Sequence, residues 1–123
     1  MRTAYGQFIE SYIREGKYEE ALGAVNIWEW EYPEVKPDGY SFLLRIRINY
    51  KLNNLNEVLK YAYYILEILE EESYKPETYH ILISLYVRAN KKESALHLFE
   101  KMKSAFPNNF YTKMLEPAFE PEH

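Results

Sequence analysis

The side chains best suited to recognition chemistry are three arginines and an asparagine at recurring places. Arg14, Asn49 and Arg88 hold equivalent positions beside apolar stripes, and Arg45 lies near one of them. The planar guanidinium group presents a fork of donors that fits a carboxylate or a phosphate. These residues therefore predict a site for an acidic group, unless they are solvated or paired with Glu10 and neighbouring acids.

Catalytic chemistry has little support in the sequence. The chain has no Cys and only 4 Gly, which excludes a Cys nucleophile and leaves almost no room for a phosphate-binding glycine loop. His80, His97 and His123 lack metal-ligand spacing, and neither an HExxH motif nor a Gly-x-Ser-x-Gly elbow is present. The sequence predicts a protein that is not an enzyme, with no cofactor and no metal.

Charge and hydropathy narrow the classes of partner and compartment. The net charge is −4, with residues 1–38 holding 4 Lys/Arg against 8 Asp/Glu, and the basic excess usual for nucleic-acid binders is missing. Apolar runs are too short for a membrane span, and residues 1–13 do not resemble a secretory signal. We expect a non-secreted, intracellular protein, in the cytoplasm, the nucleus or an organelle matrix, without choosing among them.

The chain repeats itself. Two stretches 74 residues apart carry the same apolar stripe at i, i+3, i+4, i+7 and i+8: Tyr5, Phe8, Ile9, Tyr12, Ile13, and Tyr79, Leu82, Ile83, Tyr86, Val87. Seventy-four is twice 37, which predicts a third unit between them. There Tyr40, Leu43, Leu44 and Ile48 match the stripe at a shift of 35, and residues 55–65 match the second helix at a shift of 37. We therefore expect two extra residues in the turn near 51–54.

Turn residues and prolines delimit the units. Gly16, Asn54 and Asn90 each stand three residues before a Glu, which predicts a capping box at the start of each second helix. Prolines fall between units, where helices must end. The expected hairpins are 3–15 with 17–31, 39–52 with 55–73, and 77–89 with 91–105, followed by a short helix at 109–116. This predicts one helical-repeat domain, residues 1–116, and a flexible tail, residues 117–123.

One segment carries a competing signal. Apolar and polar residues alternate strictly from Leu44 to Leu52, which is typical of a strand. The flanking repeats and the lack of a partner strand favour a helix there. The predicted fold class is therefore all-α, an array of about three α-α hairpins in a short right-handed solenoid with a short C-terminal helix.

These units resemble the tetratricopeptide (TPR) and pentatricopeptide (PPR) repeats, over residues 3–109. The TPR pattern W-x2-L-G-x2-Y, A-x3-F, P is matched by Tyr5-x2-Phe8-Ile9-x2-Tyr12, Ala21-x3-Val25, Pro33, and by Tyr79-x2-Leu82-Ile83-x2-Tyr86, Ala95-x3-Phe99, Pro107. Ile9 and Ile83 replace the small residue of the TPR pattern and are more similar to PPR repeats. Residues 95–102, and the Lys-Pro-acid runs at 36–38 and 75–77, are similar to PPR repeats as well.

The resemblance implies that the first helices line a concave groove that binds a partner. The groove residues would be Glu10, Ile13, Arg14, Ser41, Arg45, Ile48, Asn49, His80, Ser84, Val87 and Arg88. Trp30 and Tyr32 would add exposed aromatic contacts, which are favoured at protein interfaces. We expect a protein-protein interaction adaptor or scaffold module that takes a protein or peptide with an acidic group, in a larger complex or a longer repeat array.

The PPR resemblance implies an alternative, a factor that binds single-stranded RNA one base per repeat. The base-reading pairs would be Gly6 with Asp38, Ser41 with Glu77, and His80 with Asn109, a degraded set because Gly6 has no side chain. A purely structural subunit is a third alternative. The early apolar residues of the first helix further suggest either a fragment of a longer array or an end covered by another subunit, such as a second copy.

Overall fold

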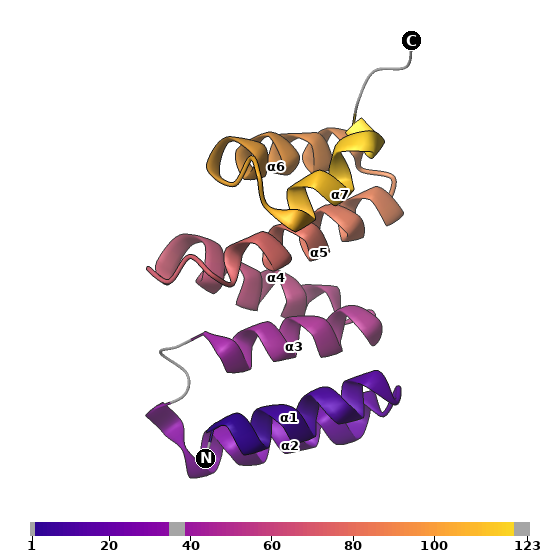
Figure 1. Ribbon diagram of the computed structural model, residues 1–123. Coiled ribbons are helices and arrows are strands. Elements are labelled where there is room, and N and C mark those ends of the chain that lie inside the picture. The colour runs from indigo at the N-terminus through magenta and orange to yellow at the C-terminus, as the bar shows by residue number, and fades with distance from the viewer. Residues whose placement is uncertain (1, 35–38, 120–123) are drawn as a thin grey trace. The chain divides into compact units, whose positions relative to one another are not determined.

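Three helical hairpins and one further helix make up the computed structural model, which describes residues 2–34 and 39–119 (Figure 1). Within these ranges every regular element is helical and no strand occurs, so the all-α hairpin-repeat prediction is confirmed. The elements are α1 (Arg2–Arg14), α2 (Tyr18–Glu31), α3 (Tyr40–Lys51), α4 (Leu55–Tyr63) with the π-helical turn η2 (Tyr64–Ile68), α5 (Lys75–Arg88), α6 (Lys92–Ala105) and α7 (Phe110–Phe119).

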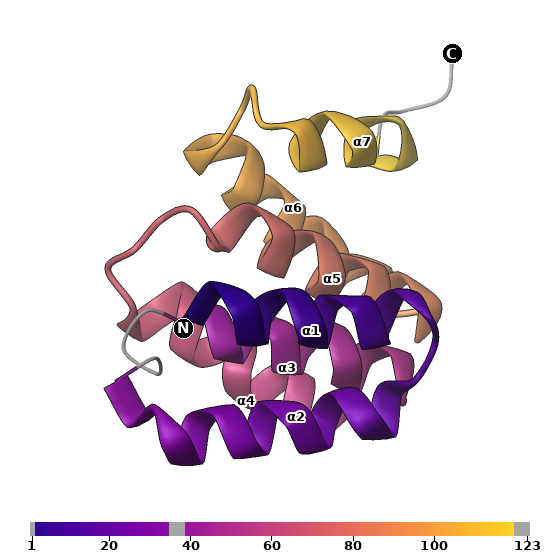
Figure 2. The same cartoon turned by 60° about the horizontal axis from the view of Figure 1, so that its bottom comes forward.

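The helices group into two compact units, Met1–Tyr74 and Lys75–His123. In the first unit α1 and α2 lie side by side, and α3 packs on both of them and on α4 (Figure 2). In the second unit α5 pairs with α6, and α7 packs on both. Each first helix thus lies against its own second helix, as the hairpin prediction requires.

The core repeats with a period of 37 residues. Three sets of equivalent positions are fully buried in every hairpin: Ile9, Ile46 and Ile83; Ala21, Val58 and Ala95; Trp28, Ile65 and Met102. One position lies on the first helix and two on the second, and together they join the two helices of each hairpin. Burying an aliphatic side chain contributes about 1.5–3 kcal/mol, so these positions carry much of the hairpin's stability.

The same period appears in the turns. Gly16, Asn53 and Asn90, each 37 residues from the next, adopt left-handed backbone angles with φ of 77°, 62° and 62°. In the first turn Gly16 N–H donates to Ile13 and Lys17 N–H to Tyr12, and the same pair of bonds closes the other two turns. This is the Schellman ending of a helix, where Gly and Asn tolerate a positive φ.

These turns correct two predictions. The second helices begin without a side-chain cap, so the predicted capping boxes are wrong, and Gly16 and Asn90 instead end the first helices. The turns are evenly spaced, which shows that the predicted two-residue insertion near 51–54 is absent. The repeat is 37 residues throughout, so Ile46, two residues beyond the predicted Leu44, is the equivalent of Ile9.

The alternating segment is helix α3, and its burial explains the misleading pattern. Leu44, Ile46 and Ile48 are all fully buried, although a helix places Ile46 on the side opposite to Leu44 and Ile48. Because α3 packs against the first hairpin on one side and α4 on another, apolar residues two apart are both needed. Alternation here reflects a helix buried on several sides.

The C-terminal helix α7 runs further than predicted, to Phe119, with Pro117 inside it. Of the expected tail, residues 117–119 are helical, and residues 120–123 lie outside the described part of the chain. Within the described ranges, the helices are all too short or too polar to cross a bilayer.

Candidate partner-binding surface

A cavity of about 210 Å³ lies between α1 and α3, the first helices of the first and second hairpins. Its walls are Glu10, Ile13 and Arg14 from α1 and Arg47 from α3. The first three were predicted groove residues, and the structure brings them together with an arginine that the sequence reasoning missed. The 37-residue spacing of the turns would have found Arg47, because it places Arg47 at the position of Glu10.

Glu10 is already engaged on one side of this cavity. The Tyr40 hydroxyl donates a hydrogen bond to the Glu10 carboxylate, linking the start of α3 to the middle of α1. Burial of the phenol raises the pKa of Tyr40 above its ordinary value, and the hydrogen bond to Glu10 raises it further. Tyr40 therefore stays protonated and fixes Glu10, while Arg14 is exposed and Arg47 is half-buried at the cavity.

The other predicted groove residues of α3 lie in the interior. Ser41, Arg45, Ile48 and Asn49 are all buried, so they do not face the cavity as expected. The prediction used the 35-residue shift, which assigns these positions to the wrong side of α3. Asn49 donates to the Arg45 carbonyl at 2.8 Å and accepts from Asn54 at 3.0 Å, a local role at the end of the helix.

Arg45 is held by residues of the neighbouring helix α2. Its Nη2 lies 2.7 Å from Glu29 Oε1 and 2.6 Å from Asn26 Oδ1, and its Nε donates to Glu29 Oε2 at 3.2 Å. The guanidinium also lies over the Tyr61 ring. A buried charge is tolerated when it is paired and hydrogen-bonded. The Arg45 guanidinium therefore links α2 to α3 and does not bind an external partner as predicted.

The predicted groove residues of the second unit lie on α5. Val87 and Arg88, equivalent to Ile13 and Arg14, are exposed, and Ser84 is half-buried. The His80 ring lies against Tyr111 of α7 with centroids 5.1 Å apart. Burial lowers the pKa of His80, although the Glu77 carboxylate opposes that shift. Whether any of these residues contacts a partner stays a prediction.

The positions expected to read bases are used for packing. A Cβ atom at Gly6 would lie 2.8 Å from the Tyr40 ring, so this place is closed. Its equivalents, 37 and 74 residues on, are the buried Leu43 and the half-buried His80, while Ser41 is fully buried. Asn109 accepts a bond from the Tyr111 N–H at 2.9 Å at the start of α7. Asp38 lies outside the described residues.

Of the two predicted aromatic contacts, one is freely accessible. Trp30 is 83% exposed, whereas Tyr32 is half-buried with its ring edge against Tyr5. Trp28 belongs to the core, stacked on Tyr5 with ring centroids 6.1 Å apart. The described residues contain no group of three His, Asp or Glu side chains placed to hold a metal ion.

Two segments of the chain, residues 3–27 and 77–105, match the family described as PPR repeat. They coincide with the first and third hairpins, where the TPR and PPR resemblance is strongest. Repeats of this non-enzymatic family are commonly nucleic-acid-binding or protein-binding modules. No curated protein matches the chain, and no solved structure matches it.

Proposed function

We propose, from the premise that this chain is a TPR/PPR-like helical-hairpin repeat, that it is a protein-binding adaptor whose cavity between α1 and α3 holds an acidic side chain of a partner. The observation that carries the proposal is the pair Arg14 and Arg47 beside the apolar Ile13. Two guanidinium groups can bind a carboxylate through charge-assisted hydrogen bonds, and an apolar neighbour can cover its methylene stem.

The size of the cavity supports a side chain as the occupant. About 210 Å³ is smaller than the roughly 300–1,000 Å³ typical of small-molecule sites. The acidic net charge of the unit, 8 Lys/Arg against 13 Asp/Glu over residues 1–74, makes the local pair of arginines selective. An acidic segment would be repelled elsewhere and attracted here, which favours a defined register of binding.

Single-stranded RNA is the second candidate, supported by the PPR match and by the same two arginines, which also suit phosphate. The first-helix positions Gly6 and Leu43 count against it, because glycine has no side chain and the buried leucine is apolar, so neither residue can read a base. We therefore rank the protein partner first.

The test compares two probes on one set of variants. The probes are a series of aspartate- and glutamate-containing peptides and a mixed-sequence single-stranded RNA of 12 nucleotides. Arg14→Glu reverses one cavity charge on an exposed side chain, and Lys17→Glu makes the same change at an exposed residue outside the cavity. Fluorescence anisotropy measures affinity, and circular dichroism checks helicity.

We expect at least one acidic peptide to bind wild type and the Lys17→Glu control alike, and Arg14→Glu to weaken that binding at least tenfold. RNA should bind weakly to all three. Tight RNA binding with a steep salt dependence that Arg14→Glu reduces, together with no peptide binding, would replace the proposal with the RNA alternative.

A further inference from the structure

The outer side of α2 carries a largely exposed apolar stripe that lies outside the hydrophobic core of its hairpin. Gly23, Ile27 and Trp30 follow the spacing i, i+4, i+7, which places them on one side of the helix. Ile27 is 54% and Trp30 is 83% exposed. The core of the hairpin uses the other side of α2, through Ala21, Val25 and Trp28, so this α2 stripe is free of any role in the hairpin's own packing.

The third hairpin lacks this stripe. The α6 residues 74 positions further on are His97, Lys101 and Ser104, all polar and all exposed. The fold therefore does not require apolar residues at these places, since the third hairpin forms without them. An exposed tryptophan that the fold does not need is typical of a binding hot spot.

Gly23 adds a second, independent sign. A Cβ atom at Gly23 would meet nothing within 4 Å, and its backbone is ordinary helix. Glycine inside an exposed helix costs about 1 kcal/mol relative to alanine, so nothing within the unit favours it. A missing side chain next to Ile27 leaves a shallow gap in which a side chain from outside can approach the helix backbone.

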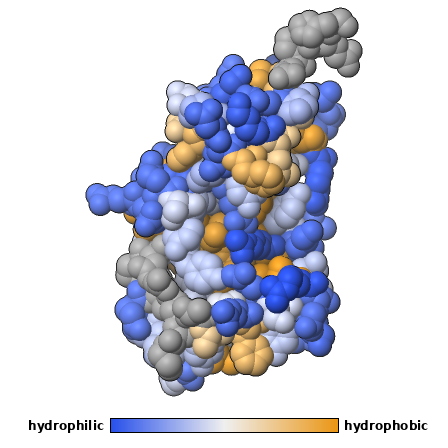
Figure 3. Space-filling view, viewed as in Figure 1, coloured by the Kyte–Doolittle hydropathy of each residue, from blue (hydrophilic) through white to orange (hydrophobic). Residues whose placement is uncertain are grey.

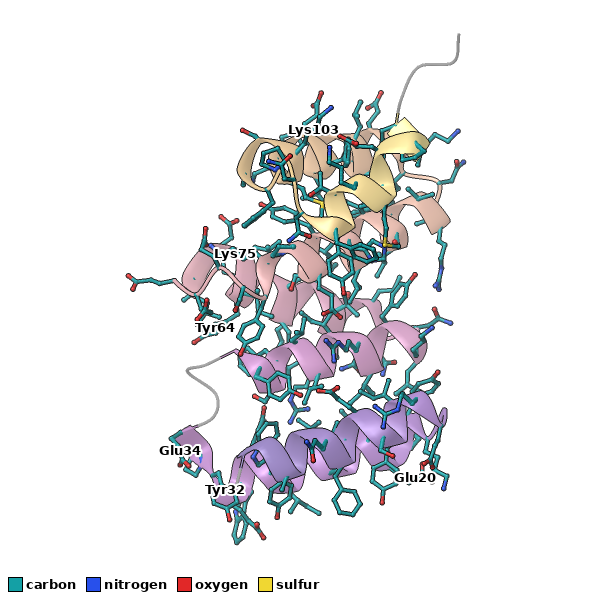
Figure 4. The ribbon with its side chains drawn as sticks, viewed as in Figure 1. Glu20, Tyr32, Glu34, Tyr64, Lys75 and Lys103 are labelled. Carbon is teal, nitrogen blue, oxygen red and sulfur yellow. The ribbon has the colours of Figure 1, made fainter. Side chains whose placement is uncertain are left out.

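The charges around the stripe all have one sign. Helix α2 holds four glutamates and no Lys or Arg: Glu19, Glu20, Glu29 and Glu31. Glu20 and Tyr32 mark the two ends of the hairpin's second helix in Figure 4. Figure 3 shows a small apolar area at the lower end of the view, with hydrophilic surface on either side of it. Glu29 is paired with Arg45, whereas Glu19, Glu20 and Glu31 are exposed and flank the stripe, with Glu31 also accepting a hydrogen bond from the Tyr5 hydroxyl.

We propose that the α2 stripe docks a basic amphipathic helix of a partner protein. Its apolar side chains would pack on Ile27 and Trp30 and enter the gap at Gly23, and its Lys or Arg residues would lie near Glu19, Glu20 and Glu31. The stripe runs over eight residues, from Gly23 to Trp30, or about 10 Å of helix, so about two turns of partner helix cover it. Charge complementarity selects a basic occupant over an acidic one.

This second surface is separate from the cavity of the proposed function. The cavity binds an acidic group through α1 and α3, and the stripe binds a basic helix through α2, with no residue in common. The chain would then join two partners of opposite charge. Because the residues differ, the failure of one surface in its assay leaves the other surface untouched.

The test uses the full chain and one designed peptide of 14 residues, with leucines at i, i+4 and i+7 and lysines on both flanks. A matched peptide replaces every lysine with glutamate. Trp30 is exposed and the only other tryptophan, Trp28, is buried, so docking should shift tryptophan emission to the blue. We expect the basic peptide to bind at least tenfold more tightly than the acidic one.

Three variants separate docking from general attraction between charges. Trp30→Ala and Gly23→Leu keep the net charge, and each should weaken peptide binding at least tenfold. Because Trp30→Ala removes the emitting side chain, the affinities of all variants are compared by fluorescence anisotropy of the labelled peptide. Gly23→Leu should also keep or increase thermal stability, because the gap is open and leucine favours helix. His97→Leu, the same change at the equivalent place on α6, should alter binding less than twofold. Unchanged binding by Trp30→Ala and Gly23→Leu, or equal binding of both peptides, would overturn the proposal.

Discussion

The first and second hairpins have equivalent core positions, but one side of their first helices differs. On α3 this is the side that packs against the first hairpin. On α3 this side carries Leu44 and Ile48, both fully buried in the cluster that includes Ile9 and Trp28 of the first hairpin. On α1 the equivalent residues, 37 positions earlier, are Gln7 and Ser11, which are exposed and half-buried. The same side of the repeat is thus apolar on α3, where the first hairpin covers it, and polar on α1.

A third position on the same side of the first helix, Phe8 on α1 and Arg45 on α3, also differs between the hairpins. Phe8 on α1 is 64% exposed, whereas its equivalent on α3, Arg45, is buried between Glu29 and Asn26 of α2. Arginine here also interrupts the stripe on which the family resemblance depends, and the second hairpin lies between the two matched segments. At this position an ion pair therefore joins the second hairpin to the first, whereas the first hairpin has an exposed phenylalanine there.

The largest effect expected from this difference is at Arg45. Arg45→Ala should lower the free energy of unfolding by about 3–5 kcal/mol, because it leaves the Glu29 carboxylate buried without a counter-charge. Phe8→Ala, at the equivalent position on α1, should change it by no more than about 0.5 kcal/mol, since the side chain is mostly exposed. Urea denaturation followed by circular dichroism measures both.

A double variant, Arg45→Leu with Glu29→Leu, sharpens the test. Replacing both members of a buried pair with apolar residues is often neutral or stabilising, so this protein should be more stable than Arg45→Ala. Equal losses for Arg45→Ala and Phe8→Ala would show that the ion pair does not join α2 to α3.

The turns offer a smaller effect that tests the 37-residue register. Gly16→Ala should lower stability by about 1–2 kcal/mol, because alanine is strained at a φ of 77° although no atom lies within 4 Å of its Cβ. Asn90→Gly, at the equivalent turn, should change stability in the opposite direction by less than about 1 kcal/mol. Thermal denaturation measures the pair, and a tolerated Gly16→Ala would contradict the shared turn.

The smallest effect extends the comparison to the third hairpin. Gly6 and Leu43 do not titrate, but His80 at the same position does, and burial lowers its pKa below 6.5. The unfolded chain therefore binds a proton at His80 more readily than the folded chain does. The contribution of neutral His80 to the free energy of unfolding is complete above about pH 6.5 and is lost as pH falls through the pKa of the folded state. The stability of wild type should fall more between pH 7.5 and 5.5 than that of His80→Gln. Equal pH slopes would show that His80 is not desolvated.

The buried positions of the second helices were predicted correctly because their pattern is clean, although the middle one ends at Ile68 and not at residue 73 as predicted. Ala21, Val58 and Ala95 lie at a constant 37-residue shift and are all fully buried. The first helix of the middle hairpin was aligned with the other repeats two residues out of register, because Leu44, Ile46 and Ile48 are all apolar. A helix buried on several sides offers several stripes, and periodicity cannot choose among them. Only the left-handed turn at Asn53 sets the register.

For the candidate site, the sequence by itself determined which residue types recur: arginines beside apolar stripes, and an exposed tryptophan at the end of α2. The three α-hairpins also followed from the sequence, because helix periodicity and turn residues are local properties of the chain. Which arginine joins two helices and which lines the cavity was decided only by the tertiary structure. Arg45 meets Glu29, 16 residues away, whereas Arg47 turns to the cavity, because the partner that a charged side chain reaches depends on how α2, α3 and α1 pack together.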